Sequence, residues 1–409
     1  MIGDCNKLLS HATAVGLTVR MLAIGGRKVS RGLDRPHRHR RRVVKPASLI
    51  YHFIERPFGS YWGVGRIYLH PSVVNQNSSR NPFIEASCML VMFSARPFLG
   101  SLAYRSALVP LALIGLWSCM PAQGKTLVVG TDQELKLPSA AASVARAGDT
   151  IVIEAGEYFD CAVWRADHLT IEGKGGGAVI TDKTCEGKGL FITRGNDITI
   201  RNLTFTRARV PDGNGAGIRA EGVNLRIEHS RFINNENGIL ANPSPTSTIT
   251  ILDSEFTRNG KCEPNCAHGI YINEVALLHV EGSKFMETKT GHHIKSRALR
   301  TELIGNEIVD GEAGTSSYLV EIPNGGSLVM TNNVMEKGPH SSNHGTAVSI
   351  GAEGVSHRTA ELTISGNKFT NDQDRETVFV RNMTATEAVL SGNSFKGKVI
   401  PLVGDGTVR

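Results

Sequence analysis

ITIRNLTF, residues 198–205, is a clear copy of a short pattern that recurs down the chain as far as residue 395. In each copy an aliphatic residue lies five positions before an apolar anchor, and in LVMTNNVM we take this pair as Val329 and Val334. The other copies are LRIEHSRF (225–232), ITILDSEF (249–256), LHVEGSKF (278–285), TELIGNEI (301–308), LVMTNNVM (328–335), LTISGNKF (362–369) and AVLSGNSF (388–395). The anchors are Phe205, Phe232, Phe256, Phe285, Ile308, Val334, Phe369 and Phe395, at spacings of 27, 24, 29, 23, 26, 35 and 26 residues.

The period of the repeat predicts the fold class. Short alternating strands at intervals in the mid-twenties, with no amphipathic helix between them, are typical of a solenoid of β coils. A β-sandwich and a propeller are the alternatives, but both expect hairpin turns between successive strands, which this sequence lacks. We therefore expect an all-β chain of stacked coils.

Each coil also contains a second short strand after the anchor. These segments are GAGIRAEG (215–222), NGILAN (237–242), HGIYINE (268–274), GHHIKSRA (291–298), YLVEIP (318–323), TAVSIGAEG (346–354) and TVFVRN (377–382). Because side chains alternate along a strand, one apolar residue of each segment is predicted to point inward. The expected inward stack is Ile218, Ile239, Ile270, Ile294 and Val348.

A resemblance sharpens this prediction. LPSAAASVARAGDTIVIEAGEYFD (137–160) resembles the opening segment of pectate-lyase-like right-handed parallel β-helix proteins, in which a short capping helix precedes the first coil. HGIYIN, GHHIKSRA, SSYLVEIPNGG and IGAEG resemble secreted bacterial β-helix-repeat proteins, whose reaction is not firmly assigned. The resemblance covers about residues 125–400 and implies a single-stranded right-handed parallel β-helix of about nine coils. It implies no single activity, since this fold hosts lyases, epimerases, hydrolases and binding proteins.

The capping helix has a physical reason of its own. An open solenoid end exposes unpaired strand edges and apolar core, so it needs a lid. The Ala-rich segment 137–147 is predicted to supply that lid, with Gly148 ending the helix.

The excess of positive over negative charge lies entirely at the start of the chain. The net charge is +7, but the first 100 residues hold 15 Lys and Arg against 4 Asp and Glu, whereas the other 309 hold 30 against 34. A basic arm for nucleic acid is one interpretation of residues 1–88. We favour another, that they are a mis-assigned upstream or disordered basic segment, because a signal peptide is predicted after them and such a peptide works only at an N-terminus. No nucleic-acid partner is expected.

Residues 89–124 are predicted to be that signal peptide. Met89 and Met92 precede Arg96 and Arg105, an apolar run ALVPLALIGLWSCM (107–120) and a small-residue cleavage site. The run is too short to span a bilayer, and a lipoprotein site at Cys119 is a minor alternative. We expect a monomer that is secreted or periplasmic, with a β-helix domain at 125–409.

The cysteines agree with export. Four lie in the predicted mature chain, and an even number in an exported protein indicates disulfides. Metal binding by four thiols is the alternative, but their spacings match no common zinc pattern. The predicted pairs are Cys161–Cys185 and Cys262–Cys266, the latter closing the loop CEPNC.

The most polar second strand, GHHIKSRA, is the candidate site. With Ile294 inward, alternation also directs His292 and Ser296 inward, where they serve the scaffold, and places His293, Lys295 and Arg297 outside. Stacking the preceding coil in register sets His268, Tyr271 and Asn273 beside His292, Lys295 and Arg297, and the following coil brings Tyr318 and Glu321 near.

These side chains suit chemistry on an acidic polysaccharide. Cleaving or epimerising a uronate begins with removal of a proton next to a carboxylate, which needs cations and a base. Lys295 and Arg297 are the predicted cations, and His268, Tyr271 or His293 the predicted base or acid. Asn273, Tyr318 and Glu321 are predicted to bind substrate, either the polysaccharide or a cell-surface glycan.

Three alternatives stay open at this point. In the first, the patch is only the polar, solvated outer face of the solenoid. In the second, the protein is a non-catalytic module that binds glycan or organises the envelope, and in the third it is a glycoside hydrolase. A hydrolase needs a pair of carboxylates at a defined separation, and Asp212, Glu221, Glu321 and Glu353 are candidates that no motif pairs.

No metal site is predicted, because DGNG (212–215) and NDQD (371–374) lack the ligand density of a calcium loop. A calcium requirement is left open. CEPNC either forms a rigid wall over the patch or pins a long loop.

Overall fold

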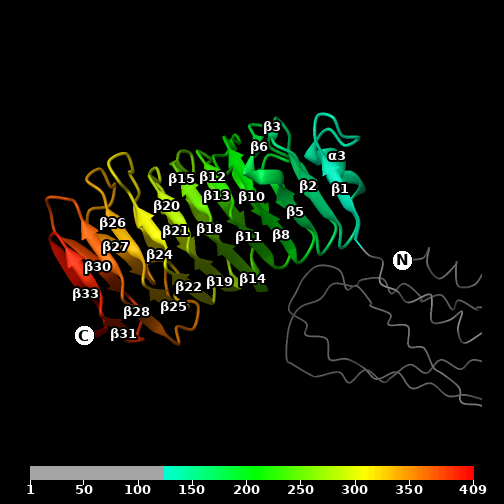
Figure 1. The fold of residues 1–409 in the computed structure, drawn as a ribbon. Helices are drawn as coiled ribbons and strands as arrows, with labels where there is room; N and C mark the ends of the chain where they lie inside the picture. The colour runs from blue at the N-terminus through cyan, green and yellow to red at the C-terminus, as the bar shows by residue number, and fades with distance from the viewer. Residues whose placement is uncertain (1–123) are drawn as a thin grey trace, which may run out of the picture. The chain divides into compact units, whose positions relative to one another are not determined.

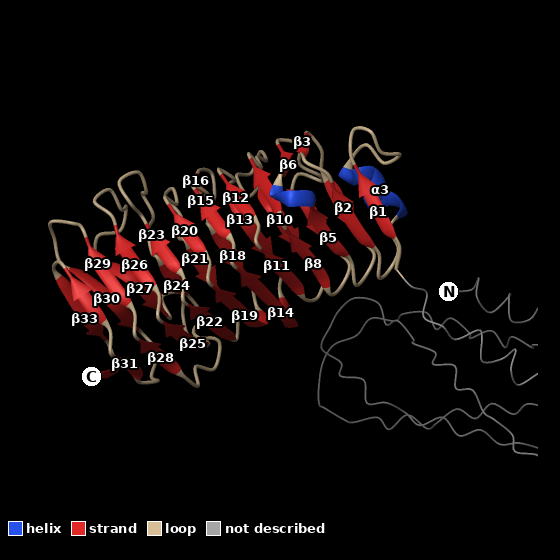
Figure 2. Ribbon diagram, viewed as in Figure 1, coloured by secondary structure: helices blue, strands red, loops and turns tan. Residues whose placement is uncertain are grey.

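The computed structural model of this protein describes residues 124–409, which form one coiled ribbon of parallel strands (Figure 1). The ribbon consists of strands joined by loops and turns, with short helical segments only near its N-terminal end (Figure 2). Each coil contributes one strand to each of three parallel sheets, which hold 12, 10 and 10 strands. The predicted parallel β-helix is confirmed, with ten complete coils where about nine were expected. The basic segment 1–88, the predicted signal peptide at 89–124 except for Gly124, and Cys119 lie outside the described residues.

The strands of each sheet follow one another along the helix axis. Sheet 1 consists of β1 (Thr126–Val129), β2 (Thr150–Ile153), β5 (Thr170–Gly173), β8 (Ile198–Arg201), β11 (Leu225–Glu228), β14 (Ser244–Leu252), β19 (Val275–Glu281), β22 (Arg300–Ile304), β25 (Ser327–Thr331), β28 (Leu362–Ser365), β31 (Ala388–Ser391) and β34 (Gly406–Val408). Sheet 2 consists of β3 (Gly156–Tyr158), β6 (Ala178–Thr181), β9 (Leu203–Thr206), β12 (Arg231–Ile233), β15 (Glu255–Thr257), β20 (Lys284–Met286), β23 (Glu307–Val309), β26 (Val334–Lys337), β29 (Lys368–Asn371) and β32 (Ser394–Lys396). Sheet 3 consists of β4 (Ala162–Trp164), β7 (Gly189–Thr193), β10 (Ala216–Ala220), β13 (Asn237–Ala241), β18 (Ile270–Ile272), β21 (Ile294–Ser296), β24 (Val320–Ile322), β27 (Thr346–Ile350), β30 (Thr377–Asn382) and β33 (Val399–Val403).

Aromatic side chains stack along the inside of sheet 2. Phe232, Phe256 and Phe285 follow one another with ring centroids 4.6 Å apart and ring planes within 4° of parallel. All three are fully buried, and the strand register aligns them coil by coil. The recurrent Phe of the sequence pattern is therefore the core residue that sets the spacing of the coils.

Hydrogen-bonding side chains stack at the corner between sheets 1 and 2. Each Ser or Asn side chain there accepts a bond from the backbone N–H of the equivalent residue one coil earlier, at distances of 2.9–3.2 Å. The acceptors are Ser254, Ser283, Asn306, Asn333, Asn367 and Asn393. These bonds satisfy buried N–H groups at a turn where no sheet partner is available, which explains the recurrent SGN of the sequence.

The strand register tests both sets of predicted core residues, the inward stack of the second strands and the row of anchors. Ile218, Ile239, Ile270, Ile294 and Val348 are aligned and buried as expected, with Val320 completing the row. The anchor Val334, however, was wrong by one residue. Met335 pairs with Ile308 and Phe369 and is buried, whereas Val334 is 47% exposed. Methionine fills an anchor position here because its flexible side chain adapts to an irregular core.

The N-terminal lid is a helix, α3 (Pro138–Val144), shorter than the segment 137–147 predicted for it. The chain leaves helical geometry at Ala145, ahead of Gly148. The Asp149 carboxylate then accepts bonds from the backbone N–H groups of Lys125 and Arg146, both at 2.8 Å, and ties the exit of the helix to β1. Pro138 and Ala141 provide the buried face of the lid.

Both predicted disulfides are present. Cys161–Cys185 joins successive coils, with the Cα atoms 5.4 Å apart. Cys262–Cys266 closes a small antiparallel hairpin of β16 (Lys261–Cys262) and β17 (Cys266–Ala267) that leads directly to His268. Disulfides are typical of proteins in oxidising compartments.

The aromatic stack yields a stability prediction. Phe256→Ala removes a ring packed on both sides, so we expect it to lower the free energy of unfolding by about 3–5 kcal/mol. Phe159→Ala is the matched control, because Phe159 is 61% exposed, and its effect should stay within about 0.5 kcal/mol. Urea titration followed by circular dichroism measures both. Equal effects of the two substitutions would show that the stack does not support the coils.

Candidate functional site

The outer face of sheet 3 carries the column Tyr271, Lys295 and Glu321. Strand pairing places Lys295 directly between the other two, one coil from each. Parallel strands lie about 4.8 Å apart, so these side chains are in contact range. The predicted pairing of Tyr271 with Lys295 is confirmed, and Glu321 lies in the same column.

A ladder of aromatic rings runs beside this column, at the start of the same strands. His268 and His292 stack with centroids 4.7 Å apart, and Tyr318 continues the ladder 5.1 Å from His292. Tyr271 meets His268 edge-on at 5.2 Å. The predicted neighbourhood of His268, His292 and Tyr318 is thus confirmed.

Backbone hydrogen bonds fix the tautomer of both histidines. His268 Nδ1 accepts a bond from the N–H of His292, and His292 Nδ1 accepts one from the N–H of Tyr318, each at 3.0 Å. A neutral ring whose Nδ1 accepts a bond carries its proton on Nε2. Burial, followed by the charges of His292, Lys295 and Arg297, lowers the pKa of His268 well below its ordinary value. His268 is therefore a neutral ring with no free basic nitrogen.

Glu321 forms the buried counter-charge of the site. Its Oε2 atom lies 2.8 Å from Lys295 Nζ and 3.1 Å from His292 Nε2, and its side chain is 5% exposed. Neither contact meets the geometry of a hydrogen bond, so His292 and Lys295 interact with Oε2 electrostatically, at close range and away from solvent. Burial raises the pKa of Glu321, but His292 and Lys295 outweigh burial and lower it to about 2. Glu321 is therefore ionised at any physiological pH.

Burial and the nearby carboxylates act in opposite directions on the pKa values of His292 and Lys295, and the balance differs between the two groups. Burial lowers the pKa of His292, and this exceeds the upward effect of Glu321. Burial also lowers the pKa of Lys295, but Glu321 and Glu353 outweigh it and the pKa rises. The site therefore contains a neutral imidazole beside a firmly charged ammonium group.

Glu353 closes the site from a loop that follows β27. One carboxylate oxygen accepts a bond from Lys295 Nζ at 2.7 Å, and the other accepts one from Arg297 at 2.5 Å. Arg297 also donates to Asn324 and, through Nε, to the Tyr271 hydroxyl at 3.0 Å. The pKa of Glu353 is lowered, since Lys295 and Arg297 outweigh its partial burial. Its side chain is 42% exposed, so this carboxylate borders solvent, unlike Glu321.

His293 is not part of this patch, and the prediction that it points outward was wrong. It is fully buried, with Nδ1 2.9 Å from Thr288 Oγ1 and Nε2 2.9 Å from Asp310. The prediction that His292 points inward was wrong for the same reason. β21 begins only at Ile294, so the two histidines belong to a turn in which strand alternation does not apply. Ser296 lies inside the strand and is buried as predicted, bonded to Thr301.

Asn273 is placed beside the patch but is engaged by the scaffold. Its side-chain amide donates to the Ala241 carbonyl of the preceding coil at 2.7 Å. The amide nitrogen is committed to backbone, which leaves Asn273 less free to bind substrate than predicted.

The structure bears on the carboxylate pairs considered for a hydrolase. Glu321 and Glu353 both bind Lys295, and the pKa of each is lowered. A hydrolase needs one carboxyl group with a raised pKa to act as general acid. Glu221 is engaged elsewhere by Lys188 and Arg194, and the Asp212 loop holds the side chain of Asn265 from the CEPNC hairpin. Glu221, Glu321 and Glu353, whose pKa values are all lowered, therefore lack the environment of a general acid.

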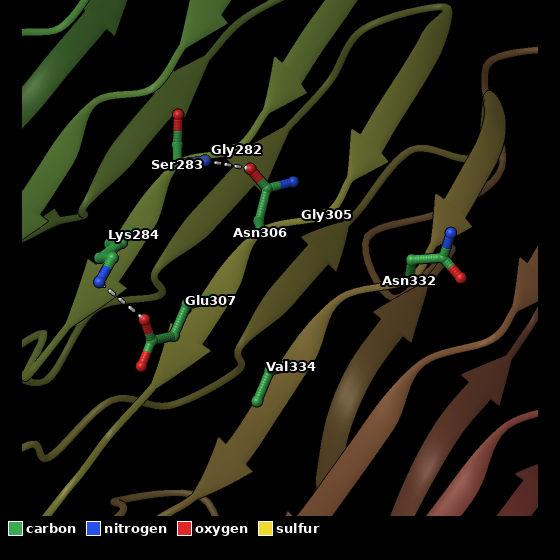
Figure 3. A pocket seen from close by; sticks show the side chains of 8 residues that line it. All are labelled: Gly282, Ser283, Lys284, Gly305, Asn306, Glu307, Asn332 and Val334. Atoms are coloured by element: carbon green, nitrogen blue, oxygen red, sulfur yellow. Dashed lines mark hydrogen bonds and ion pairs between the residues drawn. The ribbon is translucent and has the colours of Figure 1, made fainter.

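A hollow of about 380 Å³ lies at the corner between sheets 1 and 2 (Figure 3). It is lined by Gly282, Ser283, Lys284, Gly305, Asn306, Glu307, Asn332 and Val334. Its polar groups are already paired: Ser283 N–H donates to Asn306, and Lys284 lies 3.3 Å from Glu307. The hollow therefore lies along the turn ladder, away from the Tyr271, Lys295 and Glu321 column of sheet 3.

Two further observations concern residues 124–409 as a whole. No group of three or more His, Cys, Asp or Glu side chains converges there as metal ligands would. No helix there has the length and apolarity needed to span a bilayer.

Comparison with known proteins supports the architecture. A family model described as "Right handed beta helix region" matches residues 146–308, which confirms the expected handedness. Solved structures to which the chain is similar include pectate lyase Pel9A (12% identity, 71% of this chain and 79% of that chain, TM-score 0.44) and an alginate lyase from Paenibacillus sp. str. FPU-7 (16%, 67% and 99%, 0.46). The mannuronan C-5 epimerase AlgE4 A-module of Azotobacter vinelandii is another (15%, 66% and 94%, 0.33). Among curated proteins, none matches this chain. At these identities and TM-scores, the similarities to solved structures carry no conclusion about fold or activity, and the support for the architecture comes from the family model.

The buried charge of Glu321 predicts a dependence of stability on pH. Unfolded Glu321 titrates near 4.5 and folded Glu321 near 2, so in that window only the unfolded chain binds the proton. Stability is therefore lost as the pH falls from about 4.5 to about 2, by on the order of 2–3 kcal/mol from this group. Glu321→Gln should flatten this slope in urea titrations, whereas Glu312→Gln, at an exposed position, should leave it unchanged. Parallel curves for the wild type and Glu321→Gln would contradict the assignment.

Proposed function

We propose that the Lys295–Arg297 site binds the carboxylates of an acidic polysaccharide and transfers a proton next to one of them, as a lyase or a uronate epimerase does. The observation that carries the proposal is the position of Glu353. Its two oxygens are held separately by Lys295 and Arg297, so the two cations already form a clamp for a carboxylate. Because Glu353 is partly exposed and comes from a loop, a substrate carboxylate can take its place.

The clamp would serve the reaction as well as binding. Removing the proton next to a uronate carboxylate builds negative charge on that carboxylate, and adjacent fixed cations stabilise it. Arg297 suits this role because a guanidinium group presents paired donors to a planar carboxylate. Lys295 is held in position by buried Glu321, so little reorganisation is needed.

Tyr271 is the best candidate for proton transfer. Its hydroxyl oxygen accepts a bond from Arg297 Nε at 3.0 Å, which places the hydroxyl at the edge of the clamp. The bond to a cation also stabilises negative charge on that oxygen. His268 and His292 carry their protons on Nε2, so we assign them to lining the site and donating hydrogen bonds.

The column on sheet 3 supports a polymer as the ligand. Following the register, Arg219 lies three coils before Lys295, and Arg381 lies three coils after it. At about 4.8 Å per coil the cations recur at about 14 Å along one face. A chain of uronates lying along the helix axis would meet a cation at both ends of this stretch.

A second candidate function is glycan binding without chemistry. It is favoured by the state of the histidines, since neither has a free basic nitrogen. Under this alternative the clamp and the aromatic ladder hold the glycan and Tyr271 transfers no proton. For either function we infer a secreted or periplasmic location, which the two disulfides support.

Incubation with pectate, alginate and glycosaminoglycans tests the proposal. Ultraviolet absorbance detects unsaturated uronate from a lyase, and proton NMR detects epimerised uronate. Lys295→Ala and Arg297→Ala should each reduce the rate by about 100-fold or more, since each removes a group that stabilises developing charge. Tyr271→Phe should abolish turnover while glycan affinity changes little. Lys284→Ala, at an exposed lysine of sheet 2, is the control and should have no effect.

The outcomes separate the two candidates. Turnover that depends on Tyr271 supports the enzyme. Binding without turnover, weakened by Lys295→Ala and unaffected by Tyr271→Phe, supports the binding module. Neither turnover nor binding with any of the three glycan classes would refute both.

A further inference from the structure

Directly behind the site lies a buried lysine that the proposed reaction does not use. Lys337, the last residue of β26, is fully buried, and its Nζ atom donates a hydrogen bond to the Ser317 carbonyl oxygen. Lysine is rarely buried to this extent, because removing an ammonium group from water costs several kcal/mol. A position in the core that keeps lysine therefore calls for an explanation.

The bond from Lys337 ends on the peptide group that controls His292. The Ser317 carbonyl and the Tyr318 N–H are the two ends of one peptide group, and that N–H donates to His292 Nδ1 at 3.0 Å. A cation on the carbonyl oxygen polarises the amide and makes its N–H a stronger donor. Lys337 thus acts on His292 through a single peptide group.

The consequence for the site follows from the tautomer. With Nδ1 occupied, the proton of His292 lies on Nε2, the ring nitrogen that is 3.1 Å from Glu321 Oε2. The same oxygen lies 2.8 Å from Lys295 Nζ. The orientation of His292 therefore helps to fix the carboxylate that fixes the clamp lysine.

The counter-charge of Lys337 is Asp310. The Asp310 carboxylate accepts the N–H of Gly338, the residue after Lys337, at 3.2 Å and lies 2.9 Å from His293 Nε2. Burial lowers the pKa of Lys337 to about 8, and the charge of Asp310 acts against this. The pKa of Asp310 is lowered because His293 and Lys337 outweigh its burial. The pair keeps Lys337 predominantly charged near neutral pH.

We propose that Lys337 is a positioning residue, which holds the Ser317–Tyr318 peptide so that His292 keeps the Nε2–H tautomer facing Glu321 and Lys295. It touches no substrate. The inference concerns the site of the proposed function, but the tautomer does not depend on whether that site binds a glycan.

Ring-nitrogen NMR of His292 tests the proposal. In the wild type, long-range proton–nitrogen spectra should show a single tautomer with Nδ1 unprotonated. Lys337→Met fills the same space without a donor, and we expect His292 to lose this single tautomer while His268 keeps its own. Lys337→Gln retains a donor of nearly the same reach and should restore the tautomer in part. Lys284→Met is the surface control.

Binding provides a second measure. Losing one hydrogen bond that orders the site should weaken affinity for a uronate oligomer by on the order of 3- to 10-fold in Lys337→Met, with thermal stability monitored in parallel. A Lys337→Met protein that folds, keeps the wild-type His292 tautomer and binds as the wild type does would overturn the proposal. Altered His292 spectra with no glycan binding in any variant would refute the proposed function alone.

A titration of the intact lysine covers the case in which Lys337→Met does not fold. As Lys337 loses its proton near pH 8, the His292 ring shifts should show a step. The measurement is made in a Glu336→Gln background, because burial and the neighbouring Asp372 raise the pKa of Glu336 to about 7. The other ionisable side chains near Lys337 are Asp310 and the two rings His292 and His293. Flat His292 shifts between about pH 7.5 and 9 would overturn the proposal.

Discussion

The parallel register of one coil on the next is the constraint on which the rest of this structure depends. It places equivalent residues about 4.8 Å apart along the helix axis, so every position of the repeat becomes a column. Inside sheet 2 the column is a stack of Phe rings, and at the neighbouring corner it is a ladder of Ser and Asn acceptors. On the outer face of sheet 3 the same register brings Tyr271, Lys295 and Glu321 together from segments distant in sequence.

The features that strand register determines are predicted correctly from the sequence, whereas side-chain positions in turns and loops are not. The coil fold, the inward stack and the pairing of Tyr271 with Lys295 all follow from repeat spacing and strand alternation. The inward and outward positions predicted for His292 and His293 are the reverse of those observed. The strand begins only at Ile294, directly after them, and side chains in a turn do not alternate as those in a strand do. A Thr-Gly pair just before them was the available sign of that turn. Glu353 was named only as a possible hydrolytic carboxylate, because loop conformation cannot be read from a repeat.

Charge balance explains how the clamp is stable without substrate. Lys295 and Arg297 would repel each other strongly at this burial, and Glu321 and Glu353 offset that repulsion. The two carboxylates differ in position: Glu321 is buried beneath the lysine, whereas Glu353 is 42% exposed and reaches in from a loop. Glu321 is therefore a permanent counter-ion, whereas Glu353 can be exchanged for the carboxylate of a ligand. Specificity for acidic over neutral glycans follows, since a neutral sugar would leave the displaced clamp unpaired.

The central claim is that a substrate carboxylate takes the place of Glu353 between Lys295 and Arg297. The most direct test is calorimetric titration of the wild type and Glu353→Gln with a uronate oligosaccharide and with its carboxyl-reduced, neutral counterpart. Removing the competing carboxylate should raise affinity for the acidic oligosaccharide several-fold and leave the neutral one weak. Unchanged or weaker binding of the acidic oligosaccharide by Glu353→Gln would contradict the account.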